Sequence, residues 1–263
     1  MLRLGRYRCH VWCMRLGRLG AWCGVAGPVL FTAAWVVSSL RQAGHSATEV
    51  QLSGLAADDA RDPQIMVAGF VALGVCSIGF GLALRRALSP GTAGAWLVVV
   101  AGAAAVAAGV FRRDHLLLVG PGFGGESWHN QVHDVASGVA YGAMLAAPLV
   151  LARRFRGDPD WAVVSRPVLI FALGSAVALA VFASRMAEPS NGVVQRVAVT
   201  LALTAEGLTA ARMLTRPAAG SPVPSGRAAI GPNQLAVQDL PAGQVWRRRG
   251  KFWGKAADRG EDP

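Results

Sequence analysis

Charged residues are scarce in this chain of 263 residues. Asp, Glu, Lys and Arg make up 16% of it, whereas soluble domains carry about 25%. Hydrophobic residues make up 53%, and the mean hydropathy is +0.39. A chain with so few charges cannot cover a water-facing surface around so much apolar material. This composition excludes an ordinary soluble globular protein.

Polar alternation is also missing from the apolar runs, which excludes the strands of a membrane β-barrel. The runs are continuous and about 20 residues long, the length that a helix needs to cross a bilayer. Lipid offers the backbone no hydrogen-bond partner, so such runs must form helices. The sequence therefore predicts an all-α fold, an integral membrane bundle of six transmembrane helices. The expected spans are about 19–40, 64–84, 93–111, 129–151, 168–183 and 193–214.

The chain is expected to have three parts. Residues 1–18 form a basic cytoplasmic N-terminal arm, and residues 19–214 form the transmembrane domain. Residues 215–263 are rich in Pro, Gly, Ser and Ala, which cannot bury a core, so we expect a disordered basic cytoplasmic tail.

Basic residues gather on one side of the predicted bundle. They lie in the N-terminal arm, in Arg85-Arg86, in the loop from Arg153 to Arg166 and in the tail. Cytoplasmic loops carry an excess of Lys and Arg, so we expect a multi-pass protein of the cell membrane with both termini cytoplasmic. The lipid bilayer is then the main partner, and the net charge of +11 reflects orientation and not nucleic-acid binding. The basic and aromatic stretch 245–255 is either a contact for anionic lipid or a solvated tail.

Cysteine is rare, and none of the four cysteines falls in a segment expected outside the cell. No extracytoplasmic disulfide is therefore expected. Cys9-His10-x-x-Cys13 resembles half of a metal site, but its second half is missing. We interpret these residues as reduced cysteines in the basic arm.

Histidines, in contrast, are concentrated in one place. Of five, four fall on the extracytoplasmic side or at the outer end of a span, near several acids. His129 and His133 are four residues apart, so they share one face of a helix, and the same step continues to Ser137 and Tyr141. The histidines are His45, His115, His129 and His133, and the acids are Asp114, Glu126 and Asp134.

A neighbouring stripe of the same span consists of Asn130, Asp134, Gly138 and Gly142. Polar residues are costly on a lipid-facing surface, so the side of the span that carries both stripes should face the bundle. Gly138-x-x-x-Gly142 would allow a second helix to approach closely.

The sequence leaves three interpretations of this cluster open. The first is structural: the polar groups join helices by hydrogen bonds and pair with Arg185 or Arg196. The second is a metal site. The third is a site for a small molecule or lipid, in which His133 and Asp134 handle protons.

In the metal interpretation, His129 and His133 are ligands, and His115, Asp114 or His45 completes the site. The cofactor is unknown; zinc is the candidate, with Asp134 or Asp114 as the catalytic base for a metal-activated water. Haem held by two histidines is disfavoured, because no other predicted span contains a histidine.

Glu206 lies well inside the sixth span, toward its cytoplasmic half. A carboxyl group within the membrane is a candidate for proton or ion movement. The alternative is a protonated or hydrogen-bonded glutamate within the bundle.

Together these marks resemble a known family. Gly27-Pro28 in the first span, Phe111 with Asp114 after the third, and His129-x-x-x-His133-Asp134 opening the fourth resemble the bacterial membrane family called domain of unknown function nine-nine-eight. The resemblance covers about residues 24–214. The family pattern has Phe-Pro before the aspartate, whereas here Arg112-Arg113 stand between Phe111 and Asp114.

The resemblance implies a six-helix membrane protein and marks Asp114, His129, His133 and Asp134 as family positions, but it implies no activity. We therefore expect a multi-pass membrane protein of unknown activity, with a polar His/Asp cluster at the extracytoplasmic end of the fourth span. One alternative is a metal-dependent hydrolase acting on a lipid or lipid-linked substrate. The other is a small transporter or membrane sensor that uses Glu206 and the fourth-span stripe.

Overall fold

The computed structural model describes residues 2–44, 46–117, 127–185 and 191–216, with side chains from Arg15 onward. All of these residues that are in regular structure are helical. The six-helix unit, residues 1–217, is described by itself. The helices are α1 (Leu2–Arg41), α2 (Pro63–Ala87), α3 (Ala93–Val110), α4 (Trp128–Arg156), α5 (Ala162–Ser184) and α6 (Asn191–Thr215), with the 3₁₀ helix η1 (Ser53–Ala56) after α1.

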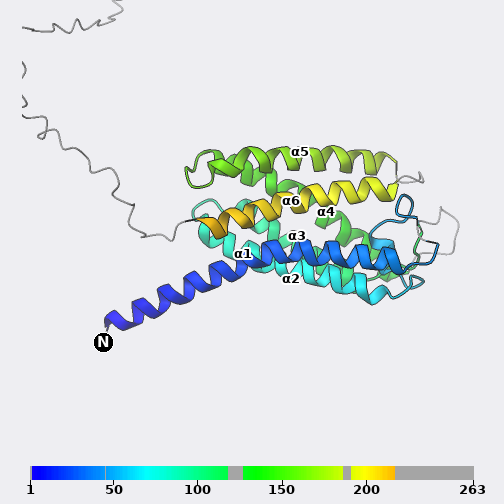
Figure 1. Ribbon diagram of the computed structural model, residues 1–263, viewed down its shortest axis with the longest axis horizontal. Helices are drawn as coiled ribbons and strands as arrows, with labels where there is room; N and C mark the ends of the chain where they lie inside the picture. Colours follow the sequence, from blue (N-terminus) through cyan, green and yellow to red (C-terminus); the bar gives the residue numbers. More distant parts are fainter. Residues whose placement is uncertain (1, 45, 118–126, 186–190, 217–263) are drawn as a thin grey trace, which may run out of the picture. The chain divides into compact units, whose positions relative to one another are not determined.

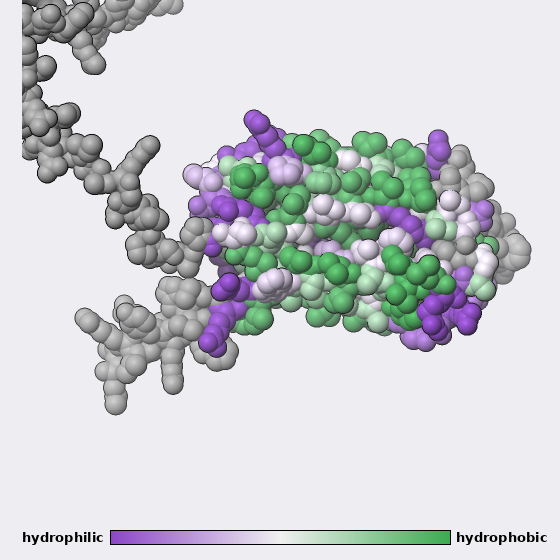
Figure 2. All heavy atoms as spheres, viewed as in Figure 1, coloured by the Kyte–Doolittle hydropathy of each residue, from purple (hydrophilic) through white to green (hydrophobic). Residues whose placement is uncertain are grey.

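All six α-helices are long and apolar enough to cross a membrane, by their length and composition. The predicted all-α membrane bundle is therefore confirmed. Figure 2 shows hydrophilic residues gathered at the two ends of the bundle, with a mainly apolar band between them. This is the surface expected of a protein whose middle faces lipid.

Each helix packs against the next one along the chain, and α6 returns to pack on α1 (Figure 1). Glycine allows the closest of these approaches. A Cβ added to Gly74 of α2 would lie 2.5 Å from the carbonyl oxygen of Gly102 in α3, so only glycine fits there. Close backbone approach through small residues is how membrane helices gain packing energy.

Two helices begin earlier than the sequence predicts. Helix α1 starts at Leu2, so the expected basic arm continues the first span as helix. Helix α5 starts at Ala162 and contains Pro167, whereas the sequence predicts a start near Val168. The reason lies in Trp161, which is fully buried and fixes the chain before α5, so that the residues up to Pro167 form the first turns. The predicted tail lies outside the described residues from Pro217 onward.

The end of the bundle that carries the end of α6 is closed by large apolar side chains; we call it the inner end. Phe155 of α4 and Trp161 stack with ring centroids 4.8 Å apart and planes 8° apart. The guanidinium of Arg216 lies 4.8 Å from the centroid of Trp161. Phe80 and Leu84 of α2 are fully buried in the same cluster.

The opposite, outer end is closed by the segment between α1 and α2. The sequence predicts a polar loop here, but residues 50–57 are all buried. The physical reason is that the segment itself contains apolar residues, and it turns Leu52 and Leu55 into the bundle. Two residues of α6 hold it: Gln195 accepts a hydrogen bond from the Leu52 N–H at 2.6 Å, and Arg196 Nη1 donates to the carbonyl oxygen of Val50 at 2.7 Å.

Candidate functional site

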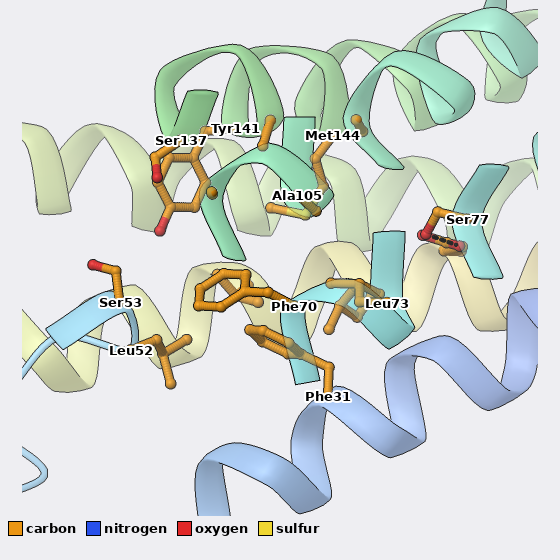
Figure 3. Close-up of a pocket in the computed structure, with 16 residues that line it drawn as sticks. Phe31, Leu52, Ser53, Phe70, Leu73, Ser77, Ala105, Ser137, Tyr141 and Met144 are labelled. Carbon is orange, nitrogen blue, oxygen red and sulfur yellow. Dashed lines mark hydrogen bonds between the residues drawn. The ribbon is translucent and has the colours of Figure 1, made fainter. Parts of the chain in front are cut away.

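A cavity of about 60 Å³ lies inside the bundle, directly beneath η1. Residues of α1, α2, α3, α4, η1 and α6 line it, and the lining is mostly apolar. Figure 3 shows Tyr141 and Ser137 on one wall, with Phe31, Phe70 and Leu52 across the cavity from them. The polar residues among its lining are Ser53, Ser77, Ser137, Tyr141 and Glu206.

The predicted polar stripe of α4 supplies one wall. Ser137 and Tyr141 both line the cavity, as their four-residue spacing on one helix face allows. Gln195 Nε2 donates to the Tyr141 hydroxyl oxygen at 2.6 Å, while its Oε1 accepts from Leu52. This amide therefore joins α4, α6 and the segment that closes the outer end. It fixes where the Tyr141 hydroxyl lies.

Glu206 lines the same cavity from α6, further toward the inner end. Its carboxyl group accepts a hydrogen bond from the Ser77 hydroxyl of α2 at 2.9 Å. A second cavity of about 30 Å³ lies on its other side and also touches Glu206 and Met144. The intramembrane carboxyl group thus lies between two spaces within the bundle.

His133 is buried in the wall beside the cavity. Its Nδ1 lies 2.8 Å from the Ala108 carbonyl oxygen and 2.9 Å from that of Phe111. Because both contacts are carbonyl acceptors, Nδ1 carries the hydrogen and Nε2 has a lone pair. Nε2 is buried and has no hydrogen-bond partner among the described residues. His133 therefore joins α4 to the end of α3 through backbone hydrogen bonds.

His129, one turn earlier, has a different environment. It is exposed, and its ring lies against that of Trp128 with centroids 3.7 Å apart. His115 is also exposed, with Nδ1 3.4 Å from a carboxylate oxygen of Asp59. The three histidines predicted as metal ligands therefore have separate partners.

Asp114 and Asp134 are linked by one network at the start of α4. Asp114 accepts hydrogen bonds from the Ser127 hydroxyl at 2.5 Å and from the Ser127 N–H at 2.8 Å, and these bonds hold the pKa of Asp114 below its usual value. The Ser127 oxygen accepts from the Asn130 N–H, as an N-cap does. Asn130 Nδ2 donates to Asp134 at 3.0 Å. The two acids therefore cap and orient α4.

Across the described residues, no group of three His, Cys, Asp or Glu side chains lies close enough to hold a metal ion. His45 and Glu126, which the sequence placed near the cluster, lie outside the described residues.

Arg113 is a buried cation of this region. Only 7% of it is exposed, its Nη1 donates to Gln51 Oε1 at 3.2 Å, and its buried Nε has no partner in the described structure. Gln51 precedes Leu52 and Ser53, which line the cavity. Through Gln51, Arg113 is therefore attached to the segment that closes the outer end of the cavity.

A family model described as "Protein of unknown function (DUF998)" matches residues 25–212, which is more than half of the chain. The chain belongs to this family. No curated protein and no solved structure matches it. The DUF998 region begins within α1 and ends within α6, so it contains all the residues that line the cavity.

One sequence expectation about this DUF998 bundle is wrong, and one of the two alternatives in another is not found. Gly138 and Gly142 are exposed, and no side chain or second helix of the described chain lies within 4 Å of where their Cβ atoms would be. The polar stripe that turns inward is the one that begins at His133, because α4 packs on α3 through that face. Arg196 does not pair with the His/Asp cluster: it binds backbone carbonyl groups of residues 47, 50 and 192.

Several residues of the site were missed by sequence reasoning. Gln195, Gln51 and Ser77 are single polar residues near apolar runs, and no spacing pattern marks them. In the sequence, Arg113 stands out only as a departure from the family pattern. Its position could have indicated burial, because it is the second of two arginines directly after an apolar span and the first can reach solvent.

Proposed function

We propose that this DUF998 protein binds a small, mainly apolar molecule in the cavity within its bundle, and works as a small transporter or membrane sensor. One observation carries the proposal. The polar stripe of α4 and the intramembrane Glu206, two separate marks in the sequence, line the same apolar cavity. Binding sites for small molecules combine an apolar lining with a few placed polar groups in this way.

The polar groups divide by position along the cavity. Ser53 and Tyr141 lie toward the outer end, and the Ser77–Glu206 pair lies toward the inner end. The rise of α6 from Gln195 to Glu206 separates these levels by roughly 16 Å. A molecule lying along this axis would contact apolar side chains in between, with a hydrogen-bonding group available at either level.

The metal-dependent hydrolase is the less supported alternative. It needs His129, His133 and His115 to converge, with Asp134 or Asp114 near a metal-bound water. The contacts favour other roles, since His133 binds carbonyl groups and Asp114 caps a helix through Ser127. Zinc at this place stays a hypothesis, and the metal content of purified protein tests it.

Photochemical labelling in nanodiscs tests the proposed binding. A long-chain alcohol bearing a diazirine, added to the protein and illuminated, should label cavity residues such as Met144 and Leu203. Ala105→Leu fills the cavity and should reduce this labelling, because Ala105 lines it from α3. Ala103→Leu is the matched control: the same change, two residues away, on the exposed face of α3.

Labelling restricted to lipid-facing positions, or equal labelling of Ala105→Leu and wild type, would contradict the proposal. Both variants are first checked for unchanged folding by size-exclusion chromatography. The added methylenes of Ala105→Leu enter open space, so a fold as stable as that of the control is expected.

We also propose that the inner end faces the cytoplasm. Arg85 and Arg153 lie near the same end as the start of α1 and the end of α6 (Figure 1), and basic loops are retained on the cytoplasmic side. A reporter that works only in the cytoplasm should be active when inserted at Pro90 and silent at Asp58. The reverse pattern would overturn the orientation.

A further inference from the structure

The cavity has a buried positive charge at its outer end, and no acid among the described residues neutralises it. Arg113 is 7% exposed, yet none of the carboxylate groups in the described chain forms an ion pair with it. Its neighbour Arg112 shows the ordinary arrangement, since it is exposed and its Nη2 lies 2.8 Å from Asp58. The two adjacent arginines therefore differ in what balances their charge.

Burying an arginine without a counter-charge is costly, because the charge loses its hydration. The carboxyl-terminal end of α3, which precedes Arg113, offers a partial negative charge of about half a unit. One hydrogen bond to the neutral amide of Gln51 adds little. The remaining N–H groups favour an anion that is not part of the described chain.

Other groups with unmet hydrogen bonds lie beside this charge. Gln51 Nε2 is a buried donor without a partner. The Tyr141 hydroxyl accepts from Gln195, so its own hydrogen is free to be donated into the cavity. Figure 3 shows this hydroxyl on the side of the cavity where Ser53 of η1 lies. Tyr141 lines the outer part of the cavity, and Gln51, which binds Arg113, directly precedes the cavity-lining Leu52. Donors from α4 and from the segment that closes the outer end are therefore available at the same end as the Arg113 charge.

Below this place the cavity is apolar. Phe31, Phe70, Leu73, Val199 and Leu203 form much of the wall between Tyr141 and the Ser77–Glu206 pair. A free inorganic anion would gain nothing from such a wall. A molecule with an anionic head and an apolar chain matches both parts.

We propose that the cavity takes an anionic amphiphile, whose carboxylate or phosphate head is held near Arg113, Gln51 and Tyr141 and whose chain lies along the apolar wall. This inference rests on the proposed function, since it names the class of molecule that the cavity binds. A guanidinium with tyrosine and amide donors suits the oxygens of a carboxylate or phosphate.

Four probes separate the head from the chain. Dodecanoate, dodecyl phosphate, dodecanol and inorganic phosphate are each added to the full-length protein in nanodiscs of zwitterionic lipid, and displacement of the photoreactive alcohol is measured. At least one of the anionic amphiphiles should compete at least about tenfold more strongly than dodecanol, and phosphate alone should not compete. The better anion identifies the head group.

Variants assign the preference to one residue. Arg113→Gln should bring the anionic probe and dodecanol to similar strength, while Arg113→Lys, which keeps the charge, should retain most of the difference. Arg112→Gln is the control, because it removes a neighbouring charge that is paired at the surface. If Arg113→Gln does not fold, the wild-type comparison of dodecanoate, dodecyl phosphate and dodecanol still decides.

Equal competition by all three amphiphiles would overturn this inference and leave the proposed apolar cavity standing. A preference for anions that persists in Arg113→Gln would overturn it too. Competition by inorganic phosphate as strong as that of dodecyl phosphate would show an anion site without a chain site. Failure of every probe, together with labelling unaffected by Ala105→Leu, would count against the proposed function itself.

Discussion

The two ends of this bundle are closed by different chemistry. At the inner end, Phe155, Trp161 and Leu84 are essentially fully buried and fill the space between helices. At the outer end, the closing segment turns Leu52 and Leu55 into the bundle but also depends on hydrogen bonds through Gln195 and Arg196. A seal that depends partly on a few hydrogen bonds is expected to open at lower cost than one made of large packed rings. The cavity lies next to the outer seal.

Buried polar atoms without a hydrogen-bond partner are also distributed unequally between the two ends. Within the described part of the chain, most of the buried polar atoms without a partner belong to outer-end residues such as Gln51, Arg113 and His133. Such groups destabilise a fold unless something pairs with them. We infer that the inner half supplies most of the stability and that the outer half holds the groups available for binding.

The largest effect is expected from opening the inner seal. Trp161→Ala removes a fully buried ring that stacks on Phe155 and lies under Arg216, and it should cost about 3–5 kcal/mol of unfolding free energy. Trp22→Ala, on the 58% exposed Trp22 of α1, is the control and should cost far less. Reversible unfolding in mild detergent measures both. Similar costs would show that the inner end is not the rigid one.

A smaller effect is expected at the outer seal. Gln195→Leu leaves the Leu52 N–H without an acceptor and removes the donor to Tyr141, which should cost about 1–3 kcal/mol. Hydrogen exchange over residues 50–57 should accelerate, since Gln195 holds this segment. Gln131→Leu changes an exposed glutamine of α4 and should leave the exchange unchanged. If exchange there stays slow in Gln195→Leu, the closing segment is held mainly by its own packing.

The two histidines of α4 should differ. His133→Leu breaks contacts with two carbonyl groups and should cost about 1 kcal/mol, whereas His129→Leu on the surface should stay within about 0.5 kcal/mol. A shared zinc ion predicts otherwise: either change would release the metal and the two would have similar effects. Unfolding free energies and the metal content of the purified proteins separate the outcomes. Stoichiometric zinc lost in both variants would revive the metal site.

The sequence predicts the helices well and the site only in part. Spans are predictable because a bilayer requires long apolar runs, and all six are present. Spacing alone predicts that Ser137 and Tyr141 share one face of α4, but it does not predict that this face turns inward while Gly138 and Gly142 stay exposed. The burial of residues 50–57 is not predictable from a loop that reads as polar, and the pairing of Ser77 with Glu206 joins residues 129 positions apart. Such tertiary contacts depend on helix packing, which periodicity does not encode.

The smallest expected effect concerns acid stability at the outer end. In the unfolded chain an aspartate has a pKa of about 3.9. Hydrogen bonds from Ser127 hold the pKa of Asp114 below that value in the folded protein, and the nearby His115 and His129 act in the same direction. The stabilisation is therefore complete above the unfolded pKa. It is lost as the pH falls through the folded pKa, because the unfolded state then binds more protons.

Asp114→Asn should remove this acid-side loss while leaving the Ser127 cap of α4 in place. Thermal unfolding measured between about pH 6 and about pH 3 should show a smaller decrease for this variant than for wild type. The difference should be modest because Asp114 is only half-buried and water screens it. Identical slopes for Asp114→Asn and wild type would mean that Asp114 is not held by Ser127 in the membrane.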